Sequence, residues 1–325
     1  MSMVRAIQFR ATGGTEVLEL ADVAVGEPAA GQVRLRQTAI GVNFIDVYQR
    51  SGLYPLKLPA IAGNEGAGVI EAVGPDVREV RIGDRVAYTG LPGAYTELRL
   101  APADQLVKIP NGVSDVQAAA MMLKGMTVHY LIFTTHAVAP GETVLWHAAA
   151  GGVGLIAVQW LKAIGATTIG TAGSDEKCAL AAAHGATHMI NYSREDFVER
   201  VLALTGGKKV PVVYDSVGKN TWEGSLDCLQ PRGLMVSFGN ASGAVPPVAI
   251  GVLATKGSLF LTRPTLASYI ATRAELVTRA TALFDVVKSG TVKIEVSRKY
   301  ALADAASAHR DLESRKTTGS LVLVP

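Results

Sequence analysis

The feature that most constrains the fold is a regular alternation of short apolar strands and helices between residues 143 and 262. Continuous runs rich in Val, Ile and Leu, each followed by a helical stretch, are typical of a parallel sheet covered on both faces. Six such strands fit the two halves of a doubly wound fold. The expected strands are Thr143–His147, Thr167–Thr171, His188–Ile190, Val210–Asp215, Leu234–Phe238 and Ser258–Thr262, and the expected helices are Val153–Ile164, Lys177–His184, Asp196–Thr205 and Thr221–Leu229.

The chain before this α/β segment has a different pattern. Short alternating or β-branched stretches are separated by Gly-Pro and Gly-Asp turns, which favours an antiparallel barrel or sandwich. Ser114 and Asp115 then predict the start of a helix. After the α/β segment we expect one long helix over Ala267–Ser289 and a return to the first domain, so the boundaries are 1–124, 125–266 and 267–325. The expected strands outside the α/β segment are Val4–Phe9, Gln32–Ala39, Gly68–Val73, Arg85–Tyr88, Ile294–Tyr300 and Gly319–Val324.

Composition excludes several classes of protein. Hydrophobic residues make up 49% of the 325 and charged residues 18%, so the chain can bury a large core. The net charge of +3 is too small and too scattered for a nucleic-acid protein. No apolar run could span a membrane, and the N-terminus lacks the pattern of a signal peptide. With only Cys178 and Cys228, a disulfide scaffold is excluded, and we expect a cytoplasmic globular protein.

A glycine-rich turn gives the strongest local signal. The strand ending at His147 runs into Ala148-Ala-Ala-Gly-Gly-Val-Gly154, which opens a long helix. Glycines in such a turn permit the tight bend, the approach of a pyrophosphate to the backbone and close packing of helix on strand. The free N–H groups and the positive end of the helix dipole then face the phosphates. The sequence therefore predicts a dinucleotide site that uses Gly151, Gly152 and Val153.

The second strand indicates which dinucleotide binds. Sites specific for NAD place an acidic residue at the end of this strand, but here the strand runs into Gly170-Thr-Ala-Gly-Ser174. Asp175 lies near the expected distance, yet it follows Ser174, a good helix N-cap. Lys177 offers an ammonium group to a 2′-phosphate, and Tyr192 could flank the adenosine. We therefore expect NADPH as the cofactor.

Six stretches are spread over the whole chain: Ala39–Tyr48, Arg50–Pro55, Leu123–Thr127, His147–Gly154, Val213–Gly218 and Gly233–Asn240. They resemble the medium-chain dehydrogenase/reductase superfamily, and within it the bacterial NADPH:quinone oxidoreductases of the zeta-crystallin type. That resemblance implies a GroES-like β-barrel domain and a Rossmann domain with the active cleft between them, and a homodimer.

The resemblance also implies where the cofactor binds. The nicotinamide end would contact Asn43, Asp46, Thr127 and main-chain groups near Phe238, Gly239, Asn240, Leu261 and Arg263; the 2′-phosphate would contact Ser174, Lys177 and Tyr192. Ser216 follows the fourth strand of the α/β segment, where the cofactor crosses the sheet edge. Near the C-terminus Arg315 or Lys316 is a further phosphate contact, and the sequence does not choose between them.

The same comparison argues against a metal. Zinc enzymes of this superfamily have a cysteine where this chain has Asn43 and a histidine where it has Asn64. A catalytic zinc needs three N, S or carboxylate ligands and an open position. Glu65 and Asp46 remain, but two carboxylates make a poor zinc site. We expect no metal.

Without a Lewis acid, a substrate that already accepts electrons is favoured, and quinones qualify. We expect an enzyme that transfers a hydride from the nicotinamide C4 to a quinone, while the protein supplies alignment and electrostatics. Tyr48 and Tyr54 are the candidates for lining the quinone pocket, together with Asn43 as a catalytic candidate, and Arg263 could offset charge on the reduced quinone. No general acid is required, because water can protonate the product.

Two alternative functions stay open. A metal-free NADPH-dependent reductase of activated C=C bonds, such as enals or enones, would use the same cofactor site. An NADPH-binding protein with a structural or RNA-binding role is the other, although no face is rich enough in Lys and Arg to favour nucleic acid. Pocket polarity near Tyr48, Tyr54 and Leu91–Tyr95 would separate the two reductases.

Overall fold

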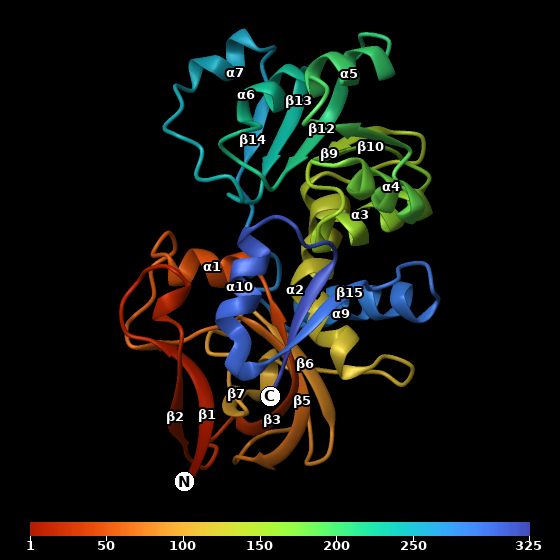
Figure 1. Ribbon diagram of the computed structural model, residues 1–325. Coiled ribbons are helices and arrows are strands. Elements are labelled where there is room, and N and C mark those ends of the chain that lie inside the picture. Colours follow the sequence, from red (N-terminus) through yellow and green to blue (C-terminus); the bar gives the residue numbers. More distant parts are fainter. The chain divides into compact units, whose positions relative to one another are not determined.

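The computed structural model describes residues 1–325, which form two compact units. Unit 1 comprises residues 1–126, 269–290 and 294–325, and unit 2 comprises residues 127–268 and 291–293 (Figure 1). The boundaries expected from the sequence fall after residues 124 and 266, and the two units change over after residues 126 and 268. The C-terminal segment returns to unit 1, apart from residues 291–293, which join unit 2.

Unit 2 contains a six-stranded parallel sheet in the order β11-β10-β9-β12-β13-β14. This is the doubly wound order, in which the direction of strand addition reverses between β9 and β12 and opens a crevice at the carboxyl ends of the strands. The strands are β9 (Thr143–Trp146), β10 (Thr167–Ala172), β11 (His188–Asn191), β12 (Val210–Asp215), β13 (Leu229–Ser237) and β14 (Phe260–Thr262).

Helices connect these strands, and right-handed crossovers place them on both faces of the sheet. Helix α3 packs beside α4, and α5 beside α6 (Figure 1). The core under α5 and α6 joins strand residues such as Leu145 and Val213 to Trp222 and Leu226. The helices are α3 (Gly152–Ile164), α4 (Asp175–His184), α5 (Phe197–Leu204), α6 (Trp222–Asp227) and α7 (Gly251–Thr255).

Unit 1 is built on two sheets. A seven-stranded sheet has the order β15-β16-β3-β5-β6-β8 with β7 also paired to β3, and a three-stranded sheet has the order β2-β1-β4. Ile7 and Phe9 of the small sheet and Leu35 and Ile70 of the large one share one core. The strands are β1 (Ser2–Phe9), β2 (Glu19–Val25), β3 (Gln32–Val42), β4 (Ala60–Ile61), β5 (Glu65–Val73), β6 (Arg85–Thr89), β7 (Leu98–Pro102), β8 (Val107–Lys108), β15 (Val296–Ala301) and β16 (Ser320–Val324).

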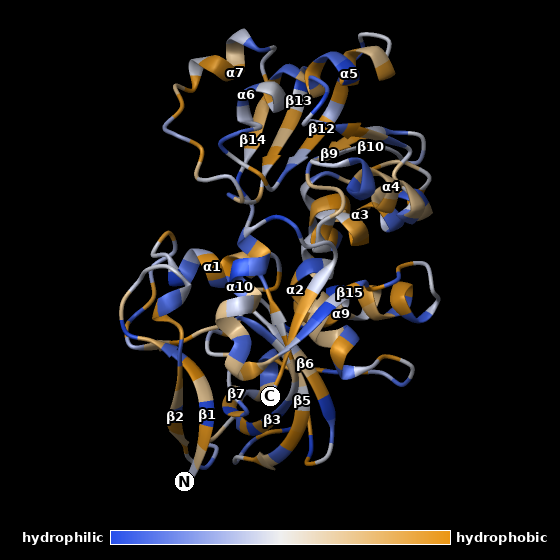
Figure 2. Ribbon diagram, viewed as in Figure 1, coloured by the Kyte–Doolittle hydropathy of each residue, from blue (hydrophilic) through white to orange (hydrophobic).

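The helices of unit 1 lie at the ends of its strands and on their outside (Figure 1). Gln117 N–H donates to the Ser114 hydroxyl at 3.2 Å, so Ser114 caps α2 as expected. Figure 2 shows hydrophilic and hydrophobic residues alternating along α10, as expected of a helix with one face on the core. The helices of unit 1 are α1 (Phe44–Arg50), α2 (Asp115–Tyr130), whose last residues belong to unit 2, α9 (Arg273–Lys288) and α10 (Ala305–Glu313), with single turns at Thr15–Val17, Ala103–Gln105 and Leu302–Asp304. The turn at Leu131–Thr135 belongs to unit 2, as does α8 (Leu266–Tyr269) apart from Tyr269.

These elements confirm the expected fold class, a GroES-like domain with a Rossmann-type parallel-sheet domain. The single helix expected over Ala267–Ser289 is wrong. Thr272 has extended backbone and its side chain accepts from the Glu275 N–H, so a new helix begins there and α8 is separate from α9. Helix α10 was not expected, because its face of small residues and His309 carries little hydrophobic signal. None of the helices is both long enough and apolar enough to cross a bilayer.

Candidate active site

The glycine turn of unit 2 leads directly into α3. Gly151 occupies the N-cap with φ −77° and ψ 172°, and no side chain caps the helix. The N–H groups of the first turn, including those of Gly152 and Val153, therefore have no intrahelical acceptor. A Cβ on Gly154 would lie 2.4 Å from the Ala148 carbonyl oxygen, so this glycine permits the close packing of helix and turn. The geometry is that of an anion site at a helix N-terminus.

The tip of β10 holds the residues expected at the adenosine end. The Ser174 hydroxyl caps α4 by accepting from the Lys177 N–H at 3.3 Å. Lys177 is half-buried, and burial lowers the pKa of its ammonium group. Asp175 is engaged elsewhere, with its carboxylate 2.6 Å from the Asn191 amide nitrogen and 2.5 Å from the Arg194 guanidinium. No unpaired acid therefore stands at this strand end.

A buried carboxylate organises the loop after β12. Asp215 accepts from the N–H groups of Val217 and Gly218 at 2.7 and 3.0 Å and from the Thr221 and Ser225 hydroxyls at 2.6 and 3.0 Å. These four bonds fix the loop that contains Ser216. Sequence reasoning missed Asp215, although an acid at the end of an apolar strand, before Ser-Val-Gly, is a readable turn signal.

The loop after β13 is held to its neighbours in a similar way. Ser216 accepts from the Ala241 N–H at 3.2 Å, so the loops after β12 and β13 are joined directly. Arg263 donates to the Gly239 carbonyl at 3.2 Å. In the orientation that satisfies both of its polar atoms, the Asn240 amide donates to that same carbonyl at 3.0 Å and accepts from Arg263 at 2.9 Å. Arg263 thus supports the loop where the nicotinamide end was expected.

His147, at the end of β9, lies beside this machinery without facing solvent. Its Nδ1 is 2.9 Å from the Thr171 hydroxyl and its Nε2 is 3.0 Å from the Ser225 hydroxyl. Burial lowers the pKa of the imidazole, while Asp215 acts against that shift. His147 is a satisfied core histidine that connects β9, β10 and α6.

Helix α1 of unit 1 presents the residues expected around the substrate. The Asn43 N–H, at the N-cap, donates to the Asp46 carboxylate at 2.9 Å, and Asp46 is 1% exposed. Tyr48 and Tyr54 are half-buried and stack edge to face, with ring centroids 5.2 Å apart. They form an aromatic pair that presents both apolar rings and phenol groups.

Next to α1, the positions that could hold a metal are occupied by a closed hydrogen-bond network. The Asn64 amide donates to Asp46 at 2.7 Å and to Gln49 at 2.6 Å. The Asn43 amide donates to Glu65 at 2.7 Å, and the Asn43 side chain also takes part in a capping box with Asp46. No group of three or more His, Cys, Asp or Glu is arranged to hold an ion. The amide donor set does not fit zinc, which needs N, S or carboxylate ligands.

Glu65 instead forms an ion pair with a lysine of the protein. The Lys124 ammonium is 6% exposed and lies 3.7 Å from one carboxylate oxygen, and the Leu123 N–H donates to the other at 2.7 Å. Burial raises the pKa of Glu65, while Lys124 and Asn43 act in the opposite direction. Sequence reasoning quoted Lys124 within a motif but gave it no role.

The structure distributes the remaining expected residues over both units. In unit 2, Thr127 is buried in α2, Phe238 packs on Trp146 with ring centroids 5.7 Å apart, and Leu261 of β14 is 44% exposed. Tyr192 is 47% exposed beside the tip of β10. Arg315 lies in unit 1 after α10, with φ 57°.

The comparisons with known proteins agree with this geometry. Residues 29–111 match the alcohol dehydrogenase GroES-like domain, and residues 152–284 match a domain described as zinc-binding dehydrogenase. The quinone oxidoreductase of Pseudomonas aeruginosa is 56% identical over 325 residues, covering 99% of this chain and all of the relative. The 2-haloacrylate reductase of a Burkholderia species is 48% identical over 99% of each chain.

Among solved structures, the Escherichia coli quinone oxidoreductase complexed with NADPH has a TM-score of 0.98 and 51% identity. The match covers 99% of this chain and 100% of that one. Since the identity extends over both units and over the whole length of these relatives, the chain belongs to the quinone oxidoreductase family of medium-chain dehydrogenases/reductases.

Proposed function

We propose that this protein is an NADPH-dependent quinone reductase that works without a metal. The proposal rests on the arrangement of residues at the carboxyl ends of β9 and β10 in unit 2. A glycine-capped helix offers unpaired N–H groups to a pyrophosphate, and Lys177 stands at a strand end whose nearby acid is already paired. The 51% identical relative crystallised with NADPH supports the same cofactor.

The proposed cofactor site follows the length of the sheet edge. Lys177, Ser174 and Tyr192 recognise the adenosine 2′-phosphate, with Arg315 as a further candidate cation. The pyrophosphate binds to the turn at Gly151, Gly152 and Val153. The N–H groups of Gly152 and Val153 lie at the positive end of α3, while the Gly151 N–H donates to the Ala148 carbonyl at 3.0 Å, so Gly151 contributes by its lack of a side chain. The proposed contacts at the nicotinamide end are Asn43, Asp46, Thr127, Ser216, Phe238, Gly239, Asn240, Leu261 and Arg263.

When bound, NADPH supplies a hydride from its nicotinamide C4. The protein contributes alignment: Asp215, Ser216 and Arg263 hold the two loops at the carboxyl end of the sheet in one arrangement. Tyr48 and Tyr54 offer ring faces to the quinone and a phenol hydrogen to the oxygen that gains charge. A proton from water completes the hydroquinone.

A second candidate reaction is the reduction of activated C=C bonds. The 48% identical 2-haloacrylate reductase favours it, since that relative has a similar chain throughout its length. Both reactions deliver a hydride to an electron-poor carbon system. They differ in what Tyr48 and Tyr54 must accommodate, a flat ring or a small carboxylate.

We also propose that the protein acts as a homodimer in the cytoplasm, with a small molecule and not a nucleic acid as its partner. The edge strand β14 supports self-association, because Phe260 and Leu261 on it are 61% and 44% exposed. An exposed apolar edge strand is a ready pairing surface. Sedimentation equilibrium at micromolar concentration would give the mass of two chains, and the mass of one chain would refute this part.

Stopped-flow oxidation of NADPH and NADH against a panel of quinones, enones, 2-haloacrylate and simple alcohols tests the function. We expect rapid oxidation of NADPH by quinones, slow oxidation of NADH, and no reaction with alcohols. Preference for 2-haloacrylate over every quinone would replace the first proposal with the second. Failure of NADPH to bind would refute both.

A further inference from the structure

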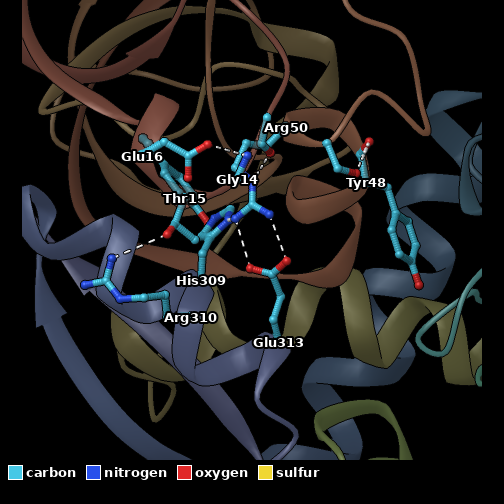
Figure 3. Close-up of polar contacts among 11 residues, drawn as sticks. Gly14, Thr15, Glu16, Tyr48, Arg50, His309, Arg310 and Glu313 are labelled. Carbon is cyan, nitrogen blue, oxygen red and sulfur yellow. Dashed lines mark hydrogen bonds and ion pairs between the residues drawn. The ribbon is translucent and has the colours of Figure 1, made fainter.

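A buried chain of hydrogen bonds connects α10 to the start of α1. From the end of α1, Arg50 reaches His309 Nδ1 at 3.4 Å, and His309 Nε2 lies 3.0 Å from the Tyr95 hydroxyl. Tyr95 in turn donates to Asp46 at 3.0 Å. All four side chains are at most 3% exposed. Figure 3 shows the Arg50 end of this chain, where His309 lies beside the guanidinium.

The fixed charge of Arg50 determines the direction of every bond in this chain. A guanidinium can only donate, so His309 Nδ1 must accept and its Nε2 must carry the hydrogen. That hydrogen points to the Tyr95 oxygen, which leaves the tyrosine hydrogen for Asp46. Burial lowers the pKa of His309 to about 3, which keeps the ring neutral and this arrangement intact.

At the surface end, Arg50 is itself held in place. Its two terminal nitrogens pair with the Glu313 carboxylate at 2.9 and 2.8 Å, and its Nε donates to the Gly13 carbonyl at 3.2 Å (Figure 3). Glu313 is partly exposed, with 35% of its side chain accessible. Because arginine does not release a proton, this chain is not a path for protons from the surface. The chain instead fixes the orientation of the His309 and Tyr95 hydrogens, so that the Tyr95 hydroxyl donates to Asp46.

The other end is a carboxylate surrounded by donors. Asp46 accepts from the Asn43 N–H, the Asn64 amide and the Tyr95 hydroxyl, and none of the three can accept a proton from it. Burial raises the pKa of Asp46 to about 6, and these bonds limit the rise. The other charged group that acts on it is Glu65 of β5, which is paired with Lys124 of α2.

We propose that Tyr95 and His309 are positioning residues for quinone reduction, acting through Asp46 to hold it ionised and to hold the first turn of α1. That turn carries Asn43 and leads to Tyr48, so the inference rests on the proposed function. Asp46 fixes the Asn43 main chain, while Glu65 fixes the Asn43 side chain. The hydrogen-bond chain therefore determines which atoms of Asn43 are available to contact a bound molecule.

Tyr88, a buried tyrosine of the same unit, provides a control that distinguishes a positioning role of Tyr95 from a role in packing. Tyr88 is as buried as Tyr95 and also donates its hydrogen to a polar side chain, that of Gln37. It accepts from Arg99, and neither Gln37 nor Arg99 lies on α1. Loss of either hydroxyl leaves the ring in place and removes two hydrogen bonds, one that the hydroxyl donates and one that it accepts. Only the loss at Tyr95 removes a donor from Asp46.

The test is the pH dependence of kcat/KM for NADPH-driven quinone reduction in Y95F, Y88F, H309L and H309Q. A lost hydrogen bond to a charged group moves the pKa of Asp46 upward by about one unit. We therefore expect Y95F to be about fivefold slower than the unaltered enzyme at pH 6 and nearly equal to it at pH 8. H309L keeps the Tyr95 hydroxyl and removes only the group that orients it, so its loss should have the same pH dependence and be smaller. H309Q should restore the profile, because its amide can accept from Arg50 and donate to Tyr95. Y88F should keep the profile of the unaltered enzyme.

Equal loss of activity at every pH in Y95F and Y88F would overturn the proposal, since packing alone predicts that result. A second measurement keeps the test independent of activity. If Y95F raises the folded-state pKa of Asp46, its free energy of unfolding should fall, relative to that of Y88F, as the pH rises from 6 to 7. That fall without any quinone reduction would refute the proposed function and leave the hydrogen-bond chain intact; no fall and no pH shift would refute the chain's role.

Discussion

Gly151 and Gly154 of the dinucleotide turn differ in the space that each leaves for a side chain. Substitution of each by alanine therefore tests a different property of the turn. A Cβ on Gly151 would meet only the Ala148 carbonyl oxygen, at 3.3 Å, and its φ of −77° suits any residue. Gly151→Ala should therefore leave stability within about 0.5 kcal/mol. A Cβ on Gly154 would lie 2.4 Å from that same oxygen and 2.6 Å from the Ala149 carbonyl.

The clash at Gly154 is with main-chain atoms, which cannot rotate away. Overpacking costs about 1–3 kcal/mol, and the gain in helix propensity from Gly to Ala returns at most about 1 kcal/mol. Gly154→Ala should therefore lower the free energy of unfolding by up to about 2 kcal/mol. It should also weaken NADPH binding, because the N–H groups at the start of α3 move with the helix.

Gly151→Ala should weaken NADPH binding without destabilising the protein. The added methyl group meets almost no protein atoms, so it can act only on a molecule bound against the turn. Loss of one charge-assisted hydrogen bond costs about 1.5–3 kcal/mol, or roughly a 10- to 150-fold rise in Kd. Urea unfolding and titration of NADPH fluorescence give the two quantities. Unchanged affinity in Gly151→Ala would refute a pyrophosphate at this turn.

Three further changes test other parts of the structure. Lys177→Gln should raise the Kd for NADPH about 10- to 150-fold and leave NADH unchanged in fluorescence titrations, with Lys162→Gln on α3 as control; equal loss for both cofactors would remove Lys177 from phosphate recognition. His309 has a folded-state pKa of about 3, below its unfolded value of 6.5, so its stabilisation is present above pH 6.5 and decreases as pH falls. Relative to His309→Gln, the protein should lose about 2 kcal/mol between pH 7.5 and 5 in urea unfolding, and a constant difference would contradict the buried neutral ring. Prolonged chelation should leave quinone reduction unchanged, and activity that returns only with added zinc would overturn the metal-free site.

The parts of the fold that could be predicted from sequence are those decided by local signals. The turn at Gly151–Gly154 and the strands β9 to β14 follow from apolar runs with glycine between them. The break between α8 and α9 also has a local signal, because Thr272 and Glu275 form a capping box. The apolar pattern continues on both sides of it, and the sequence prediction therefore joined the two helices.

The hydrogen-bond chain in unit 1 could not be predicted in this way. Tyr95 and His309 are 214 residues apart in sequence, and the return of residues 294–325 to unit 1 brings them together. A histidine among alanines and a tyrosine after a Gly-Ala pair carry no pattern that relates them. Pairing over such distances depends on tertiary packing, and no single-sequence periodicity encodes it.

The buried charges of unit 1 support the proposal that this protein works without a metal. Glu65 is fully buried, and a buried carboxylate needs a cation or several donors to remain ionised. Lys124, the Asn43 amide and the Leu123 N–H meet that need together, so both carboxylate oxygens are already in use. A divalent ion at this position would have to displace the ammonium group and break the bond that orients Asn43. Because removal of one partner of a buried ion pair costs about 3–5 kcal/mol, the arrangement that holds Asn43 also opposes a metal.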